Sequence, residues 1–252
     1  MSQAYGQPER KSKGKAFRAV SGKAETHVQP GAAGEASRYI RAFRVFARAL
    51  FKLVFRVRVK GLSNLPAGAP AIICANHLGW ADVFLIELFL PIEPRIYVLG
   101  EQEVKYISSF RTRIIDSLQI MVMLDRDKPR EALRITGDVL KRGGSLLIFP
   151  EGELGMEEGR LRELQHGAAH MSLLTGAPLV PVGLTGPSEL WLRRTLTVRI
   201  GQPVMPTSFN GDTRARMHAM TEQVSTKMQV LLPGDYDHPR IKLLRGWLTH
   251  LF

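Results

Sequence analysis

Short apolar runs bounded by polar residues alternate along this chain with segments whose apolar residues recur at three and four. The run 72–75 stops at Asn76-His77, and the run 145–149 stops at Pro150-Glu151-Gly152. Apolar runs of this length are typical of buried strands, and helical spacing follows the first run over 81–90. The same criteria predict further strands at 55–60, 95–99, 178–183 and 196–200, and helices at 36–54, 130–142, 163–174 and 212–231.

Two side chains on either side of the first predicted turn carry candidate chemistry. His77 follows a strand, so we expect it at a sheet edge, in a cleft. Asp82 falls in the first turn of the next helix, where the helix dipole favours an ionised carboxylate. The turn between them can bring Asp82 onto one imidazole nitrogen and leave the other free to accept a proton. This is the base and the orienting acid of a catalytic triad without a serine, so a substrate hydroxyl would be the nucleophile.

Three motifs resemble those of the glycerolipid acyltransferases, the lysophosphatidate acyltransferase group. His77-x-x-x-x-Asp82 after Asn76 resembles the first motif, and Phe149-Pro150-Glu151-Gly152 resembles the Phe-Pro-Glu-Gly motif at the end of a strand. The segment 178–182 is similar to the Val-Pro-Val strand of that family. The resemblance extends over roughly residues 57–204. It implies an α/β fold, with a mixed β-sheet flanked by helices as in glycerol-3-phosphate acyltransferase-like proteins.

The resemblance implies an O-acyltransferase that moves a fatty acyl group from acyl-CoA or acyl carrier protein to a lysophospholipid-type acceptor. The expected acceptor is 1-acylglycerol-3-phosphate, which would yield phosphatidate. His77 and Asp82 would be catalytic, and no metal or bound cofactor is expected. An oxyanion hole of backbone amides is expected around Gly152 or in the turn after His77. The predicted substrate-binding residues are Asn76, Arg126, Glu151 and Gly152.

The sequence departs from the family pattern where acceptor identity is read. Glu153-Leu154-Gly155 stands where many relatives carry Thr-Arg-Ser, and residues 102–118 contain neither Pro nor Gly ahead of Asp125-Arg126. Two other function classes also stay open. A hydrolase could use the same histidine and aspartate to activate water, and a non-catalytic lipid-binding module could share the fold.

The length and composition suit one catalytic domain with appendages. The chain has 252 residues and is 44% hydrophobic, enough for a substantial core. Its single cysteine, Cys74, excludes an internal disulfide and lies in an apolar run, which favours a core role. In the helix predicted over 163–174, Leu174 is expected to be buried, and His166 and His170 lack a third metal ligand. The predicted division is a disordered basic leader over 1–34, an amphipathic membrane-associating helix over 35–54, an acyltransferase domain over 55–232 and a C-terminal amphipathic tail over 233–252.

The positive charge is concentrated in the N-terminal part of the chain. The net charge is +12, and residues 1–60 contain 14 Lys and Arg against three Glu, a difference of +11. We therefore expect an anionic partner for this part, either a membrane lipid or a nucleic acid. Tyr5 and Phe17 are the only aromatic residues of the leader. They are too few for base stacking, so no nucleic acid partner is expected.

The segment 36–54 combines an apolar stripe with a parallel basic stripe. Such a helix can lie in the headgroup plane of an anionic membrane; the alternative is a helix packed on the domain with an Arg-rich outer face. The tail 240–252 is a second basic amphipathic piece, in which Trp247 suits a membrane interface. No stretch approaches the roughly 20 apolar residues of a spanning helix. We expect a cytoplasmic protein, peripheral on the inner face of the cell membrane.

Overall fold

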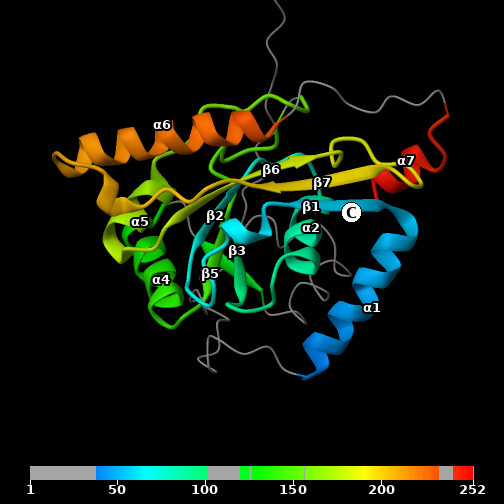
Figure 1. Cartoon of the computed structure of the whole chain (residues 1–252), viewed down its shortest axis with the longest axis horizontal. Helices are drawn as coiled ribbons and strands as arrows, with labels where there is room; N and C mark the ends of the chain where they lie inside the picture. The colour runs from blue at the N-terminus through cyan, green and yellow to red at the C-terminus, as the bar shows by residue number, and fades with distance from the viewer. Residues whose placement is uncertain (1–37, 102–119, 125–126, 156, 233–240, 252) are drawn as a thin grey trace, which may run out of the picture.

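A computed structural model describes residues 38–101, 120–124, 127–155, 157–232 and 241–251, which form helices around one sheet (Figure 1). Its seven strands have the order β1-β7-β6-β2-β5-β3-β4. Every neighbouring pair is parallel except β6 and β7. The predicted mixed sheet flanked by helices is therefore confirmed. The strands are β1 (Arg56–Lys60), β2 (Ile72–Ala75), β3 (Ile96–Glu101), β4 (Met121–Leu124), β5 (Ser145–Ile148), β6 (Leu179–Thr185) and β7 (Thr195–Ile200).

Helices cover both faces of the sheet. One face carries α1 (Arg38–Val54) and α2 (Ala81–Phe89). The opposite face carries α4 (Pro129–Lys141), α5 (Gly167–Thr175) and α6 (Thr213–Leu231). Among the described helices, none combines the length and the apolar character needed to cross a membrane. The short helices are η1 (Leu62–Asn64), η3 (Pro206–Ser208) and α7 (Arg245–Thr249).

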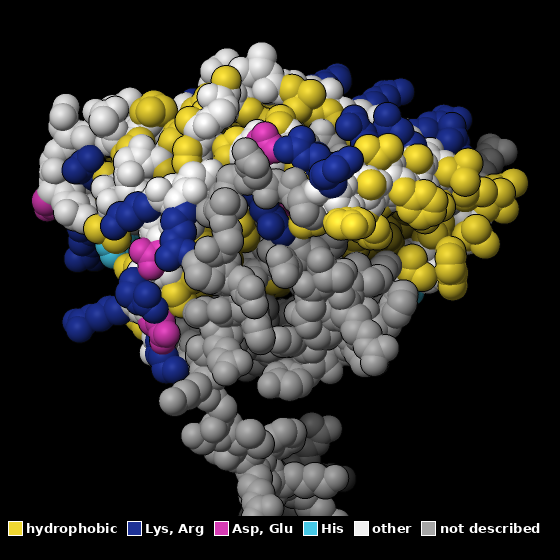
Figure 2. Space-filling view, turned by 90° about the horizontal axis from the view of Figure 1, so that it is seen from below, with side chains coloured by type: hydrophobic (Ala, Val, Ile, Leu, Met, Phe, Trp, Pro, Cys, Tyr) yellow, Lys and Arg dark blue, Asp and Glu magenta, His cyan; other side chains and the backbone are white. Residues whose placement is uncertain are grey.

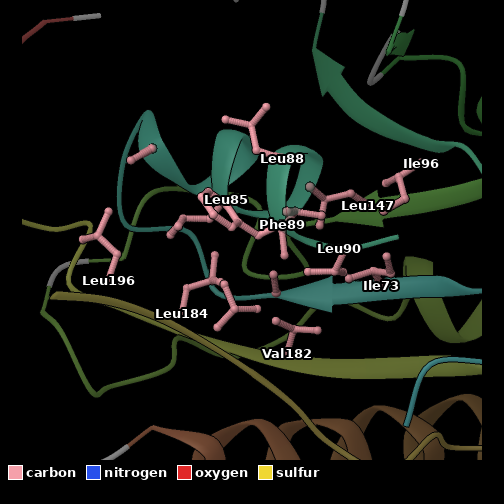
Figure 3. Packing of buried hydrophobic residues seen from close by; sticks show 14 of the residues in the cluster. Ile73, Leu85, Leu88, Phe89, Leu90, Ile96, Leu147, Val182, Leu184 and Leu196 are labelled. Atoms are coloured by element: carbon pink, nitrogen blue, oxygen red, sulfur yellow. The ribbon is translucent and has the colours of Figure 1, made fainter. Parts of the chain in front are cut away.

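Alternate residues of the central strand β2 enter two separate apolar cores. Ile73 and Ala75 join the cluster under α2, whereas Ile72 and Cys74 join the cluster under α4, α5 and α6. Figure 3 shows α2 packed over the first cluster, with Leu85 pointing into it. A strand buried on both faces needs a continuous apolar sequence. The core role of Cys74 is confirmed, and burial raises the pKa of its thiol to about 12.

The long helix α6 packs closely against β6. Met220, Val224 and Met228 are buried along its inner side, so their predicted role as core residues is confirmed. A Cβ at Gly183 of β6 would lie 2.7 Å from the Cβ of Leu231. Glycine at this position therefore permits the close approach of helix and strand.

The helix predicted over 163–174 begins four residues later, at Gly167. The amide of Arg162 donates a hydrogen bond to Glu151 Oε2 (2.9 Å), and the amide of Gln165 donates one to Pro150 O (2.8 Å). These contacts hold the segment to the end of β5 and direct its amides away from a helical ladder. The predicted burial of Leu174 is wrong, because its side chain is 61% exposed.

Helix α1 contacts the domain through the side that carries Arg44, Ala47 and Phe51, and turns its predicted apolar stripe outward. Phe51 is the one buried residue of α1. The Arg44 guanidinium donates to the carbonyl of Leu90, and the Arg48 guanidinium lies 5.1 Å from the centroid of the Phe89 ring. Arg41, Arg48 and Lys52 are nevertheless exposed, so α1 packs on the domain and still presents basic side chains to solvent. The exposed apolar residues of α1 are Tyr39, Phe43, Val45, Phe46, Leu50 and Leu53.

Candidate active site

The carboxyl ends of β2 and β5 lie side by side. Cys74 of β2 pairs with Ile148 of β5 in parallel register, so the residues that follow each strand meet at the same edge of the sheet. This register brings the turn after Asn76 next to the segment that starts at Phe149. The predicted position of His77 just beyond a strand end is confirmed.

His77 and Asp82 form a hydrogen-bonded pair across the turn. Nδ1 of His77 lies 2.8 Å from Oδ2 of Asp82 in the first turn of α2. The same oxygen accepts from the amides of Leu78 (2.5 Å) and Gly79 (2.9 Å). Nε2 has no hydrogen-bond partner in the described part of the chain, and the His77 side chain is 27% exposed. If Nδ1 carries the proton shared with the carboxylate, Nε2 is the nitrogen that can accept another.

Complete burial governs the protonation of Asp82. Desolvation raises the pKa of its carboxyl group above the ordinary value, while the hydrogen bond and charge of His77 and the amides of Gly79 and Leu78 lower it. Oδ1 finds no partner among the described residues. The ionised form of Asp82 therefore depends on the donors that converge on Oδ2.

The imidazole of His77 stacks on Phe149. The ring centroids are 4.1 Å apart and the planes differ by 17°. The stacked ring and the Asp82 contact together restrict the orientation of the imidazole. Phe149 was recognised as part of a motif, but its contact with His77 was missed because only the adjacency of β2 and β5 creates it.

Glu151 connects the two strand ends through backbone amides. Its Oε1 accepts from the amide of His77 (3.1 Å), and its Oε2 accepts from the amide of Arg162 (2.9 Å). The residue is only 4% exposed. Both carboxylate oxygens thus hold the protein chain around the imidazole. A contact between Glu151 and the acceptor stays a prediction.

Asn76 extends the pairing of β2 with β6. Its Nδ2 donates to the carbonyl of Leu184 (3.0 Å), and its Oδ1 accepts from the amide of Leu184 (2.7 Å). The side chain is buried and fixes the point at which the chain leaves the sheet for His77. Its predicted contact with substrate stays a prediction.

The segment after Glu151 turns back over the histidine. Gly152 has a φ of 74°, the left-handed region that favours glycine, and its amide donates to Phe149 O (3.1 Å). The amide of Gly155 donates to the carbonyl of His77 (2.6 Å). The position of the oxyanion hole and the contact of Gly152 with substrate stay predictions. Arg126 lies outside the described residues.

A buried ion pair between Glu158 and Arg194 holds the chain that follows Glu151. This pair was not predicted from the sequence. A terminal guanidinium nitrogen of Arg194 lies 3.3 Å from Glu158 Oε2, with side chains 4% and 11% exposed. Glu158 also accepts from the Ser188 hydroxyl (2.6 Å) and the Gly186 amide. The Arg194 guanidinium lies 4.0 Å from the centroid of the Trp191 ring. No periodicity or motif in the sequence signals this pair.

Of the two histidines with chelating spacing, His166 and His170, the structure places His166 against Thr221 and His218. His166 Nδ1 lies 3.0 Å from the hydroxyl of Thr221, and its ring centroid lies 4.2 Å from that of His218. Over the described ranges, no group of three or more His, Cys, Asp or Glu residues is arranged to hold a metal ion.

Comparison with known proteins identifies the family. The sequence model of the family described as Acyltransferase matches residues 56–185, just over half of the chain. The chain belongs to the acyltransferase family. A 1-acyl-sn-glycerol-3-phosphate acyltransferase of Bacillus subtilis (strain 168) is 30% identical over 184 residues, which cover 69% of this chain and 87% of that protein.

Other acyltransferases match over different extents. A 1-acyl-sn-glycerol-3-phosphate acyltransferase of Cocos nucifera is 32% identical over 133 residues, which cover 51% of this chain but only 42% of the plant protein. The crystal structure of the 1-acyl-sn-glycerophosphate acyltransferase PlsC from Thermotoga maritima has the same fold. The two structures agree with a TM-score of 0.60 at 22% identity, covering 79% of this chain and 81% of PlsC.

Proposed function

We propose that this acyltransferase moves a fatty acyl group from the thioester of acyl-CoA or acyl carrier protein to the hydroxyl of 1-acylglycerol-3-phosphate, giving phosphatidate. The observation that carries the proposal is the His77–Asp82 pair just beyond β2: Nε2 is free to accept a proton, and no serine or cysteine among the described residues is hydrogen-bonded to the imidazole. The relative in Bacillus subtilis carries the name of this activity.

In this mechanism His77 acts first as a base and then as an acid. Nε2 takes the proton of the acceptor hydroxyl as its oxygen attacks the thioester carbonyl carbon. The tetrahedral intermediate collapses with cleavage of the carbon–sulfur bond, and the imidazolium returns the proton to the leaving thiolate. Asp82 holds the tautomer and stabilises the imidazolium while it exists. Asn76 and Glu151 position His77 through the backbone, and no metal or bound cofactor takes part.

The acceptor is a lipid, so we place the reaction at a membrane surface. The outward apolar stripe of α1, with exposed Arg41, Arg48 and Lys52 beside it, supports association with an anionic bilayer. The cytoplasmic, peripheral location on the inner face of the cell membrane follows from the same proposal. Arg126 is proposed to bind the acceptor phosphate.

An acyl-transfer assay with purified variants tests the mechanism. His77→Ala should abolish transfer, because no base remains, and Asp82→Asn should lower kcat by orders of magnitude with little change in KM. Circular dichroism should report an unchanged fold for His77→Ala. Near wild-type transfer by His77→Ala would exclude this mechanism.

A panel of acceptors tests the substrate. Thiol release from acyl-CoA should depend on added 1-acylglycerol-3-phosphate and should give phosphatidate as the product. Thiol release at the same rate without acceptor would instead indicate a hydrolase. Transfer to a different lysophospholipid alone would retain the reaction class and exclude the proposed acceptor.

A further inference from the structure

The C-terminal segment 241–251 exposes a second set of apolar side chains. The exposed residues are Ile241, Leu243, Leu244, Trp247 and Leu251, with fractions between 40% and 74%. In contrast, Leu248 is 2% exposed and belongs to the same buried cluster as Phe51 of α1. Leu248 is therefore the apolar residue through which the segment packs on the domain, and the hydroxyl of Thr249 adds hydrogen bonds to the backbone of Leu190.

Backbone contacts join this segment to the end of α1. The amide of Leu192 donates to the carbonyl of Leu243 (2.9 Å), and the amide of Arg193 donates to the carbonyl of Val54 at the end of α1 (2.6 Å). The loop before β7 thus lies between the two elements and touches both. Figure 2 shows hydrophobic side chains gathered on the side of the molecule that carries α1 and α7, with Lys and Arg along their border.

The same segment is connected to the catalytic turn through Trp80. Trp80 lies between His77 and Asp82 in the sequence, and its Nε1 donates to the carbonyl of Leu248 (3.0 Å). Its ring also meets Phe51 of α1 edge to face, with centroids 6.5 Å apart. Both outward-facing elements therefore contact one residue of the turn that carries the proposed base.

The charge around these exposed apolar residues indicates which kind of partner binds to them. Helix α1 and residues 241–251 contain seven Lys and Arg and no Asp or Glu. Two acidic neighbours offset part of this charge: Glu93 pairs with Arg41, and Glu189 pairs with Lys242 and Arg245. The excess remains positive. A second copy of the chain would bring the same excess to the contact, and the leader 1–34 is itself basic, whereas anionic lipid supplies both opposite charge and an apolar phase.

We propose that α1 and residues 241–251 form one bilayer-docking face, whose occupant is an anionic phospholipid membrane, with the C-terminal segment as its second arm. The proposal extends the proposed function, which places only α1 at the membrane. Docking through two arms holds the turn with His77 at a defined position relative to the lipid surface, because Trp80 contacts both.

Vesicle co-sedimentation of the full chain tests the second arm. The double variant Leu244→Glu/Trp247→Glu should bind vesicles of phosphatidylglycerol and phosphatidylcholine at least about tenfold more weakly than wild type, because two apolar contacts are replaced by anionic groups. Val230→Glu is the matched control, since Val230 is 81% exposed but lies on α6, on the opposite face of the sheet. It should bind as wild type does.

Fluorescence supplies a second measurement that does not rely on the charged variant. Brominated phosphatidylcholine mixed with phosphatidylglycerol should quench wild-type tryptophan emission. Trp247→Phe should lower this quenching, because Trp247 is 62% exposed, whereas Trp80 is only partly exposed and Trp191 is 4% exposed. Quenching of Trp247→Phe to the same extent as wild type would overturn the proposal.

The remaining outcomes separate this proposal from the proposed function. Acyl transfer to detergent-dispersed acceptor should survive Leu244→Glu/Trp247→Glu, since neither side chain contacts His77 or Asp82 in the structure. Equal vesicle binding by wild type and the double variant would overturn the second arm even if transfer is normal. A change from dimer to monomer in light scattering, with vesicle binding unaltered, would assign the face to a second copy instead.

Discussion

Helices α1 and α6 have similar lengths and opposite relations to the domain. Helix α6 has 19 residues and buries Met220, Val224 and Met228 against the sheet. Helix α1 has 17 residues and buries only Phe51. Phe51 packs in the core with Ala47 and Val54 beside it, and Arg44 donates to the carbonyl of Leu90 at the end of α2. An apolar stripe therefore does not by itself indicate which side of a helix faces the protein.

The difference indicates two functions for apolar residues in this chain. Those of α6 stabilise the domain, because their burial removes apolar surface from water. The exposed apolar residues of α1 add little to the stability of the folded state and remain available to contact an apolar phase such as lipid. When α1 lies on a membrane, its basic residues are near the border of the apolar lipid phase, at the level of the lipid headgroups. The four predictions below compare the two helices by stability and by binding.

The largest expected effect on stability is at the inner side of α6. Met228→Ala should lower the free energy of unfolding by about 3 kcal/mol, the loss typical of truncating a fully buried methionine. Urea unfolding followed by circular dichroism measures it. Gln223→Ala, at an exposed position of the same helix, is the control and should change stability by less than about 0.5 kcal/mol. An equal loss in both variants would contradict the packing of α6.

A pH effect is expected where α1 meets α2. Burial raises the pKa of Glu87 to about 8, against the opposing charges of Arg44 and Arg95. The folded protein therefore keeps its proton while the unfolded chain loses it above about pH 4.3. Stability is fully present below that pH and falls as pH rises toward 8. Glu87→Gln should remove the part of this decline that Glu87 causes and raise the free energy of unfolding at pH 9.

Urea unfolding at several pH values checks this prediction. Glu222→Gln on the exposed side of α6 is the matched control and should leave the pH profile of wild type unchanged. A Glu87→Gln profile that declines as steeply as that of wild type between pH 5 and 8 would show that another group is responsible.

A smaller effect is expected at the start of α6. Asp212 Oδ1 accepts a hydrogen bond from the amide of Ala215 (2.8 Å) and caps the helix. Asp212→Ala should cost about 1 kcal/mol of stability, because that amide loses its partner. Asp212→Asn keeps an acceptor and should cost less. The same urea experiment measures both, and equal losses would exclude the cap as the cause.

The smallest effect on stability is expected on the outer side of α1. Phe46 is 68% exposed, so Phe46→Ala should change the free energy of unfolding by less than about 0.5 kcal/mol. Its binding to vesicles containing phosphatidylglycerol should nevertheless weaken severalfold, because an apolar contact with lipid is lost. A stability loss above about 1 kcal/mol with unchanged vesicle binding would indicate that protein covers this side.

Several features of the candidate site depend on the chain's local order and were predictable from the sequence. His77 and Asp82 are five residues apart across a turn that starts at a buried strand and ends in a helix, and their contact is present at 2.8 Å. The apolar run of β2 predicted a buried strand, and the run before Glu151 predicted β5. Contacts between near neighbours follow from residue spacing, because the chain itself limits the distances between them.

Contacts between distant residues were decided by the tertiary structure. Glu151 and His77 are 74 positions apart, and Asn76 and Leu184 are 108 apart. Their approach depends on β2 lying between β5 and β6, an order that periodicity does not encode. The outward direction of the α1 stripe has the same origin: amphipathic spacing defines two sides of a helix, and the placement of Phe51 and Arg44 against α2 decides which one the protein covers.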